Sequence, residues 1–178
     1  MTSDDSLHPT DLDTAIDADI SGSGLVAEKA KRLQKLADMR DAGGNPYPYR
    51  FDRSCTLTEL RAEHGALEAG TETEIEVAVA GRVMLMRDSG KLIFATVRDR
   101  DDEVQLFVSK AIIGDDAFEA LRDLDLGDWV GVHGTVMTTR KGELSVKVQS
   151  CQLLSKAVRP MPDKWHGLTD TDLSLIHI

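Results

Sequence analysis

The chain has 178 residues, 41% of them hydrophobic and 29% charged, and its formal net charge is −10. These values indicate a globular protein with room for one domain of ordinary size, and no apolar run approaches the ~20 residues of a membrane helix. Cys55 and Cys151 lie far apart without CxxC spacing, which argues against a disulfide framework or a zinc site. Because the N-terminus lacks a secretory signal pattern, we expect a cytoplasmic protein.

Most of the negative charge lies outside the central part of the chain. Residues 1–24 contain six Asp and no Lys or Arg, and they are rich in Ser, Thr and Gly, so we expect a disordered acidic tail. Residues 25–53 carry a net charge of +3, residues 54–74 of −4 and residues 75–158 of only −2. The overall acidity therefore does not exclude a nucleic-acid partner for the central region.

Residues 25–41 are predicted to form an amphipathic helix, because they are good helix formers with no Pro or Gly among them. One face carries apolar side chains from Leu25 to Ala37, and the basic residues lie elsewhere on the helix surface. The remainder of residues 25–74 is expected to be an extended connector. The basic residues of the helix are Lys31, Arg32 and Lys35. Their side chains are either solvated or in contact with a polyanion.

From residue 75 the hydrophobic period changes to two, which predicts β-strands. Strands are expected over about 75–86, 91–98, 103–109, 129–138 and 143–153, with a bend or bulge at Gly81. A short helix capped by Asp115 or Asp116 is predicted between the third and fourth strands. Three strands, a helix and two strands is the order of a five-stranded OB-fold barrel, which predicts a mainly β fold over residues 75–158.

The alternation also predicts which side chains face outward. Phe94 on the second strand and Gln105 and Phe107 on the third are expected on the outer face, with Glu143 at the start of the fifth. Aromatic rings stack on bases, and amide and carboxylate groups read base edges. The alternative is that Phe94 or Phe107 packs under the N-terminal helix. The nearby turns carry basic residues suited to phosphates, and these are Arg82, Arg87, Lys91, Arg140 and Lys141.

Short segments spread over about residues 25–172 together resemble the N-terminal anticodon-binding region of a bacterial-type class II lysyl-tRNA synthetase. Each segment is weakly diagnostic alone, whereas the ordered set is specific. The segments are Arg32-Leu33-x-Lys35-Leu36, Arg40-x-x-Gly43, Pro46-Tyr47-Pro48-x-x-Phe51, Val79-Ala80-Gly81-Arg82-Val83-Met84, Gly90-Lys91-x-x-Phe94, Gln105-Leu106-Phe107-Val108, Asp125-Leu126-Gly127-Asp128, Gly142-Glu143-Leu144-Ser145-Val146 and Leu153-Leu154-x-Lys156-x-x-Arg159-Pro160-x-Pro162-x-Lys164-x-His166-Gly167-Leu168.

The resemblance implies roles for individual residues. Phe94 matches the aromatic residue that stacks on the central anticodon uridine, Gln105 the residue that reads its edge, and Glu143 the acidic residue that contacts a neighbouring anticodon base. Arg82 and Phe107 are supporting candidates, and the basic helix would follow the tRNA backbone. The implied partner is the anticodon of tRNA(Lys).

The resemblance also implies a longer protein, because family members continue after Leu168 into a catalytic domain with ATP, lysine and Mg²⁺ sites. Residues 159–172 resemble the connector to that domain, whose Arg-x-Glu signature is missing here, so we expect no catalytic residue, metal site or cofactor in this chain. The full-length enzyme would be an ATP-dependent lysine–tRNA ligase and a homodimer. Residues 173–178 match the translation of a sequencing adapter, so we expect them not to be native.

An alternative function remains open on the sequence. A free-standing OB-fold module that binds single-stranded nucleic acid or a protein partner would show the same strand pattern. Such a module would end at a natural stop codon near this point, whereas the synthetase reading predicts that the reading frame continues.

Overall fold

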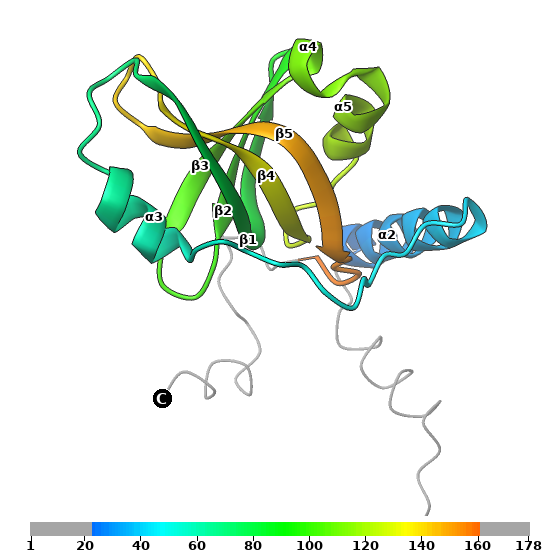
Figure 1. Cartoon of the computed structure of the whole chain (residues 1–178). Coiled ribbons are helices and arrows are strands. Elements are labelled where there is room, and N and C mark those ends of the chain that lie inside the picture. Colours follow the sequence, from blue (N-terminus) through cyan, green and yellow to red (C-terminus); the bar gives the residue numbers. More distant parts are fainter. Residues whose placement is uncertain (1–22, 161–178) are drawn as a thin grey trace, which may run out of the picture.

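The computed structural model describes residues 23–160, and five strands in this region close into a barrel in the order β1-β2-β3-β5-β4 (Figure 1). All neighbouring strands are antiparallel except β3 and β5, which are parallel. The predicted OB-fold topology is therefore confirmed. The strands are β1 (Glu72–Asp88), β2 (Leu92–Arg98), β3 (Glu103–Ser109), β4 (Trp129–Thr138) and β5 (Leu144–Ser155).

Strict alternation of side chains builds the barrel core. Ile93, Ala95 and Val97 of β2 point inward and are at most 5% exposed, and Val104, Leu106 and Val108 of β3 do the same. Residues between them therefore face outward, as successive side chains of a strand must. The inward and outward faces predicted for β2 and β3 are confirmed.

The long strand β1 pairs with β4 along its first part and with β2 along its second part. At Gly81, a Cβ atom would lie 3.1 Å from both the Arg98 carbonyl oxygen and the Val97 Cβ, so glycine permits this close approach. The register with β2 then shifts between Val83 and Leu85. An irregularity is thus present in β1, but it follows the predicted position at Gly81 by two to four residues.

Two short helices, α4 (Lys110–Ile113) and α5 (Asp115–Arg122), connect β3 to β4. Phe118 and Leu121 of α5 are buried against the core. The predicted cap is wrong, because the N-cap residue is Gly114 and Asp115 is the first helical residue. Asp115 and Asp116 lie in the first turn, where carboxylates favour the positive end of the helix dipole.

A helix that was predicted as extended connector, α3 (Leu57–His64), packs on the barrel next to the turn between β2 and β3. Thr56 and Glu59 form a capping box at its start, and Leu57 and Leu60 are only 1% exposed. The main-chain N–H of Leu57 donates to Asp99 of the turn at 3.0 Å. The prediction of an extended connector is therefore wrong for residues 57–64.

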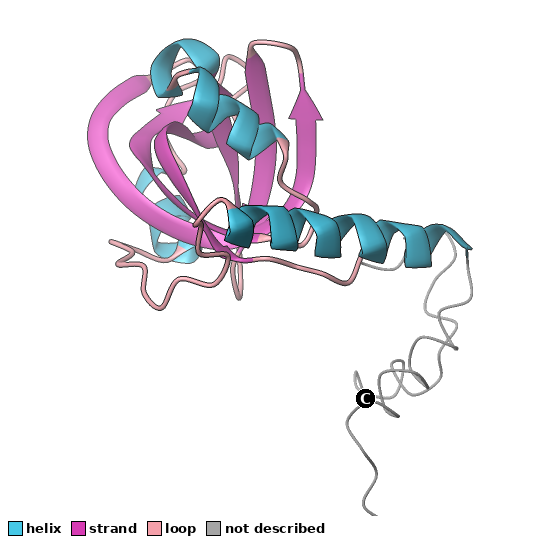
Figure 2. Ribbon diagram, turned by 90° about the vertical axis from the view of Figure 1, so that its right-hand side faces the viewer, coloured by secondary structure: helices cyan, strands magenta, loops and turns pink. Residues whose placement is uncertain are grey.

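The N-terminal helix α2 (Ser23–Asp41) lies along the outside of the barrel (Figure 2). Its docking face differs from the predicted apolar stripe, because Leu25, Val26 and Leu33 are 38–50% exposed and only Leu36 of that stripe is buried. The predicted surface position of Arg32 is also wrong, since this side chain is buried. The Arg32 guanidinium and the Lys35 ammonium group, rather than an apolar stripe, hold the helix against the barrel.

Arg32 and Lys35 bind the turn that follows α5 and the chain that leaves β5. Arg32 Nη1 donates to the carbonyl oxygens of Leu126 at 3.0 Å and Ala157 at 3.2 Å. Lys35 Nζ donates to Asp125 at 3.0 Å and to the Asp123 carbonyl oxygen at 2.8 Å. Both side chains are therefore engaged within the protein.

A buried charged cluster beneath α2 completes this contact. Lys156 is 4% exposed and pairs with Asp125 and, at 2.8 Å, with the fully buried Asp128. Burial alone would raise the pKa of Asp125, but hydrogen bonds from Lys156 and Lys35 hold that pKa below its ordinary value. The cluster ties together α2, the α5–β4 turn and the end of β5.

Several predicted segments lie outside the described residues. These are residues 1–22 of the acidic tail, residues 161–172 of the connector and the six residues 173–178. The last two residues assigned to the tail, Ser23 and Gly24, begin α2. No helix among the described residues is long and apolar enough to span a membrane.

Candidate nucleic-acid interface

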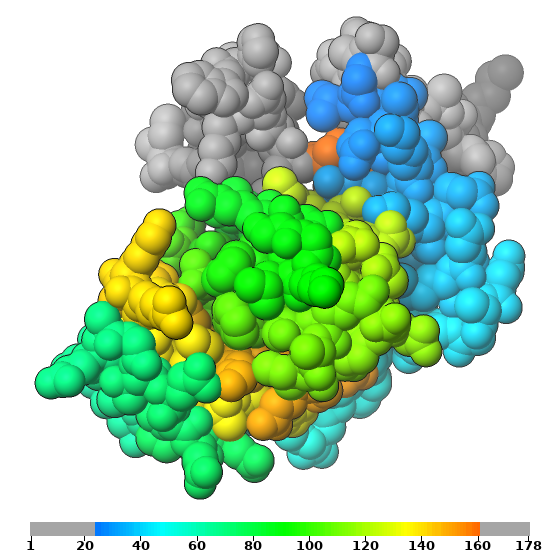
Figure 3. Space-filling view, turned by 90° about the horizontal axis from the view of Figure 1, so that it is seen from above, coloured from blue at the N-terminus to red at the C-terminus, as the bar shows by residue number. Residues whose placement is uncertain are grey.

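A broad groove of about 1110 Å³ runs over the outer face of β2 and β3 and is bordered by the end of β1 and by the hairpin between β4 and β5. That hairpin, yellow in Figure 3, projects from one side of the surface seen there. Seven of the twelve predicted site residues line this groove: Phe94, Gln105, Phe107, Glu143, Arg87, Arg140 and Lys141.

Two aromatic rings form part of the groove wall. Phe94 and Phe107 are direct cross-strand neighbours on β2 and β3, and their ring centroids lie 5.5 Å apart in an edge-to-face arrangement. Both side chains are half-buried, and they line the groove while α2 binds elsewhere. The alternative that they pack under the N-terminal helix is therefore wrong. An edge-to-face pair keeps ring surface available for stacking.

Next to the rings, Gln105 of β3 faces Ser145 of β5 across the parallel pair. The Ser145 hydroxyl lies 3.1 Å from Gln105 Oε1 and also 3.1 Å from the main-chain oxygen of Glu143. Ser145 is fully buried although it points to the outer face. The amide oxygen of Gln105 thus accepts a hydrogen bond from the buried Ser145 hydroxyl. The NH₂ group of Gln105 has no partner among the described residues.

Glu143 stands at the mouth of the groove on a hydrogen-bonded hairpin. Its main-chain N–H donates to Thr139 Oγ1 at 3.1 Å, and its carbonyl oxygen accepts from the Thr139 N–H at 2.9 Å. Gly142 makes the turn possible with φ of 84°, a left-handed conformation that favours glycine. Within residues 23–160 the Glu143 carboxylate makes no hydrogen bond or ion pair, so it is available to a ligand.

The rim of the groove is basic once internal ion pairs are removed. Glu72 pairs with Lys147 at 2.6 Å, and Glu103 pairs with Arg98 at 2.8 Å. The remaining rim cations have no hydrogen bond or ion pair through their side chains in the described part of the chain, and they are Arg87, Arg140 and Lys141. Exposed cations of this kind bind phosphate groups.

Five predicted residues do not line the groove. Lys91 is exposed in the neighbouring turn, and Arg82 lies 5.6 Å over the Trp129 ring in a cation–π contact. Lys31 is exposed on α2, whereas Arg32 and Lys35 make the protein contacts described above. The prediction that the basic helix offers all three side chains to RNA therefore needs correction for Arg32, which is buried.

One lining residue was missed because of the irregularity in β1. Leu85 is 44% exposed and lies opposite Thr96, on the same face as Phe94. Simple alternation from the inward Val83 would turn Leu85 inward, but the register shift between them reverses the face. Only the glycine at position 81 hinted at this shift in the sequence.

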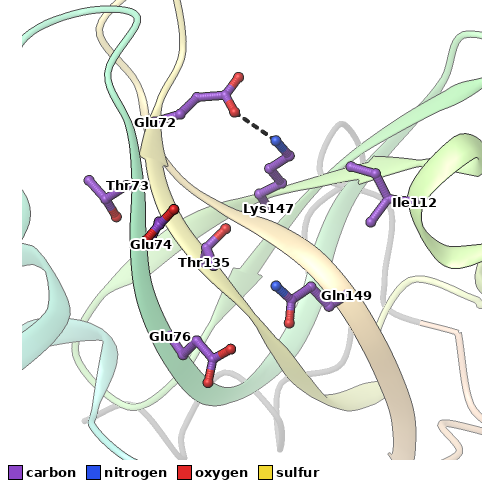
Figure 4. Close-up of a pocket in the computed structure, with 8 residues that line it drawn as sticks. All are labelled: Glu72, Thr73, Glu74, Glu76, Ile112, Thr135, Lys147 and Gln149. Carbon is purple, nitrogen blue, oxygen red and sulfur yellow. Dashed lines mark hydrogen bonds and ion pairs between the residues drawn. The ribbon is translucent and has the colours of Figure 1, made fainter.

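A second, smaller pocket lies over β1, β4 and β5 (Figure 4). Three carboxylates line it, and Lys147 is its only basic side chain and is already paired with Glu72. This surface would repel phosphates. The acidic residues are Glu72, Glu74 and Glu76. In residues 23–160, no three His, Cys, Asp or Glu side chains gather in a way that could hold a metal ion.

Comparison with known proteins agrees with this geometry. Residues 77–154 match the family described as an OB-fold nucleic acid binding domain. The chain is 44% identical over 141 residues to a lysine--tRNA ligase of Synechococcus sp. (strain CC9311), an alignment that covers 79% of this chain and 29% of the relative. It is 42% identical over 159 residues to the lysine--tRNA ligase of Prochlorococcus marinus (strain MIT 9313), covering 84% of this chain and 31% of the relative.

A lysine--tRNA ligase of Enterococcus faecalis (strain ATCC 700802 / V583) is 43% identical over 143 residues, which cover 79% of this chain. The chain spans less than a third of the length of these curated relatives, for example 29% of the Enterococcus protein. Each alignment therefore covers about four fifths of this chain but only a minor part of the relative.

Proposed function

Because this chain belongs to the lysine--tRNA ligase family and carries its OB-fold domain, we propose that the groove on β2 and β3 binds the anticodon of a lysine tRNA. The observation that carries this proposal is the set of free groups in the groove. Ring faces, an amide NH₂ and an unpaired carboxylate lie together on one surface, and they belong to Phe94, Gln105 and Glu143.

Each group has a chemical role in this proposal. Phe94 stacks on one unpaired base, and Phe107 holds the ring from its edge. Gln105 donates to a carbonyl oxygen on the edge of the stacked base, and Glu143 accepts from an N–H or amino group of the next base. Arg87, Arg140 and Lys141 bind the phosphates between these bases.

We extend the proposal to the longer protein only in outline. The relatives are named lysine--tRNA ligases, so the parent protein would attach lysine to tRNA in the cytoplasm, using ATP and Mg²⁺, as a homodimer. Among residues 23–160, no three His, Cys, Asp or Glu side chains gather in a way that would hold Mg²⁺.

A binding experiment with anticodon variants tests the proposal. The affinity of the 178-residue chain is measured by fluorescence anisotropy for an unmodified lysine tRNA transcript and for the same transcript with its anticodon replaced. The proposal predicts tighter binding of the lysine anticodon. Equal affinity for both transcripts would contradict base recognition and leave only non-specific phosphate binding.

The Phe94→Ala variant tests the stacking step. Loss of one stacked base should weaken binding of the lysine transcript by about 1–3 kcal/mol, while the barrel stays folded because Phe94 points outward. Tyr49→Ala is the matched control, since this fully exposed aromatic residue lies outside the groove. The face assignment would be wrong if Phe94→Ala unfolded the chain, as judged by circular dichroism.

A further inference from the structure

The burial of Ser145, beside the groove, contradicts its direction on the strand. The period of two places it on the outer face of β5, yet its side chain is completely buried. A buried hydroxyl needs a hydrogen-bond partner. Ser145 has two carbonyl oxygens at 3.1 Å, Gln105 Oε1 and the main-chain oxygen of Glu143.

These contacts connect the two residues that would read bases. Gln105 and Ser145 are a register pair of the parallel β3–β5 contact, so the main chain fixes their separation. The hydroxyl proton is shared between an oxygen on the Gln105 side chain and an oxygen of the Glu143 main chain. With its oxygen held at Ser145, the Gln105 amide presents its NH₂ group to the groove.

We propose that Ser145 is a positioning residue that sets base selectivity by fixing the orientation of the Gln105 amide. This inference rests on the proposed anticodon-binding function and adds a specificity-determining group beneath the surface. Ser145 does not touch the RNA in this scheme, because its side chain is fully buried.

The orientation matters because an NH₂ group donates and does not accept. Uracil carries a carbonyl oxygen at the position where cytosine carries an amino group. A fixed NH₂ group therefore bonds to uracil and meets a second donor in cytosine. Without Ser145, the Gln105 amide can turn over and offer its oxygen to the cytosine amino group, so discrimination between the two bases falls.

The experiment compares two RNA hairpins with seven-nucleotide loops that differ only in the central loop base, uridine or cytidine. Affinities of the 178-residue chain are measured for both hairpins, and the ratio of the two dissociation constants is the readout. In Ser145→Ala the preference for uridine should fall roughly three- to ten-fold, the range that one neutral hydrogen bond contributes. Ser150→Ala, an exposed serine of the same strand, is the control and should keep the wild-type ratio.

A second background separates positioning from a general structural effect. In Gln105→Ala the ratio should be low already, and adding Ser145→Ala should not change it further. If Ser145→Ala does not fold, Ser145→Cys keeps the volume with only a weak donor, and the same loss of preference is expected.

Two different results overturn the inference. If wild type prefers uridine and Ser145→Ala or Ser145→Cys keeps that preference, Ser145 does not position Gln105 although the proposed function stands. If wild type binds neither hairpin or binds both equally, the proposed base recognition fails, and the role of Ser145 fails with it.

Discussion

Replacing Arg32 tests whether buried cations, rather than an apolar face, hold the N-terminal helix. Arg32→Met removes the guanidinium while keeping a side chain of similar helix propensity. The lost contacts to the rest of the protein are the hydrogen bonds from Nη1 to Leu126 and Ala157, and the ion pair with Glu28 within the helix is lost as well. Leu36 is the only buried apolar residue of α2, so apolar burial contributes little to holding the helix.

The expected cost follows from these two bonds. A hydrogen bond from a charged donor contributes about 1.5–3 kcal/mol, and the lower value applies because one nitrogen serves both oxygens. The docking of α2 should therefore weaken by about 3 kcal/mol. Since about 1.4 kcal/mol is a factor of ten, the detached fraction should rise roughly 100-fold.

Hydrogen–deuterium exchange of peptides from residues 23–41 measures this fraction directly, since detached helices of this length are only marginally stable. Exchange should become roughly 100-fold faster in Arg32→Met, while peptides from β2 and β3 change little. Lys31→Met is the matched control, because Lys31 is an exposed neighbour on the same helix. Equal exchange rates in the two variants would refute this account of docking.

Three further predictions concern stability and reactivity. The buried Thr138 hydroxyl has no hydrogen-bond partner among the described residues. Thr138→Val should therefore raise the free energy of unfolding by about 1 kcal/mol in denaturant titrations. A loss of stability would show that this hydroxyl is bonded. The folded pKa of Asp125 is lowered, so the stabilisation from Asp125 is present above its ordinary value of 3.8 and is lost as the pH falls through the folded pKa. The free energy of unfolding should therefore fall less steeply with acid in Asp125→Asn than in wild type, and identical slopes would contradict this. Burial raises the pKa of Cys151 to about 12, so iodoacetamide at pH 8 should label Cys151 much more slowly in the folded chain than after unfolding, as peptide mass spectrometry would show. Equal labelling rates in the two states would contradict this.

The strands could be predicted from the sequence because the period of two depends only on neighbouring residues. Phe94, Gln105 and Phe107 could be assigned to the outer face from their immediate neighbours alone, and the structure places all three in one groove. The capping box of α3 was equally local, since Thr56 and Glu59 are three residues apart, and it could have predicted that helix.

Other features depend on residues far away in the chain. Arg32 is buried because two carbonyl oxygens, 94 and 125 residues further on, accept its hydrogen bonds. The buried Ser145 hydroxyl is bonded to Gln105, 40 residues away, across the parallel strand pair. Helical and strand periodicity cannot predict such partners, because it reports only which face a side chain occupies.

The closing contact of the barrel has a consequence for folding. β1, β2 and β3 form one meander, and β4 and β5 form one hairpin, so both parts are built from contacts between neighbours along the chain. The β3–β5 contact joins residues about 40 positions apart through three register pairs, beginning with Gln105 and Ser145. Ordering a loop of this length before any contact forms is entropically costly.

The β1–β4 pairing also joins the meander to the hairpin, through residues 47 to 65 positions apart. We therefore expect both the β1–β4 and the β3–β5 contacts to form after the meander and the hairpin. Neither the meander nor the hairpin alone contains the complete groove, because Phe94 and Gln105 belong to the first and Glu143 to the second. A partly folded chain would offer aromatic rings without the carboxylate, or the carboxylate without the rings. Base-selective RNA binding would thus appear only when the last pair of strands has joined.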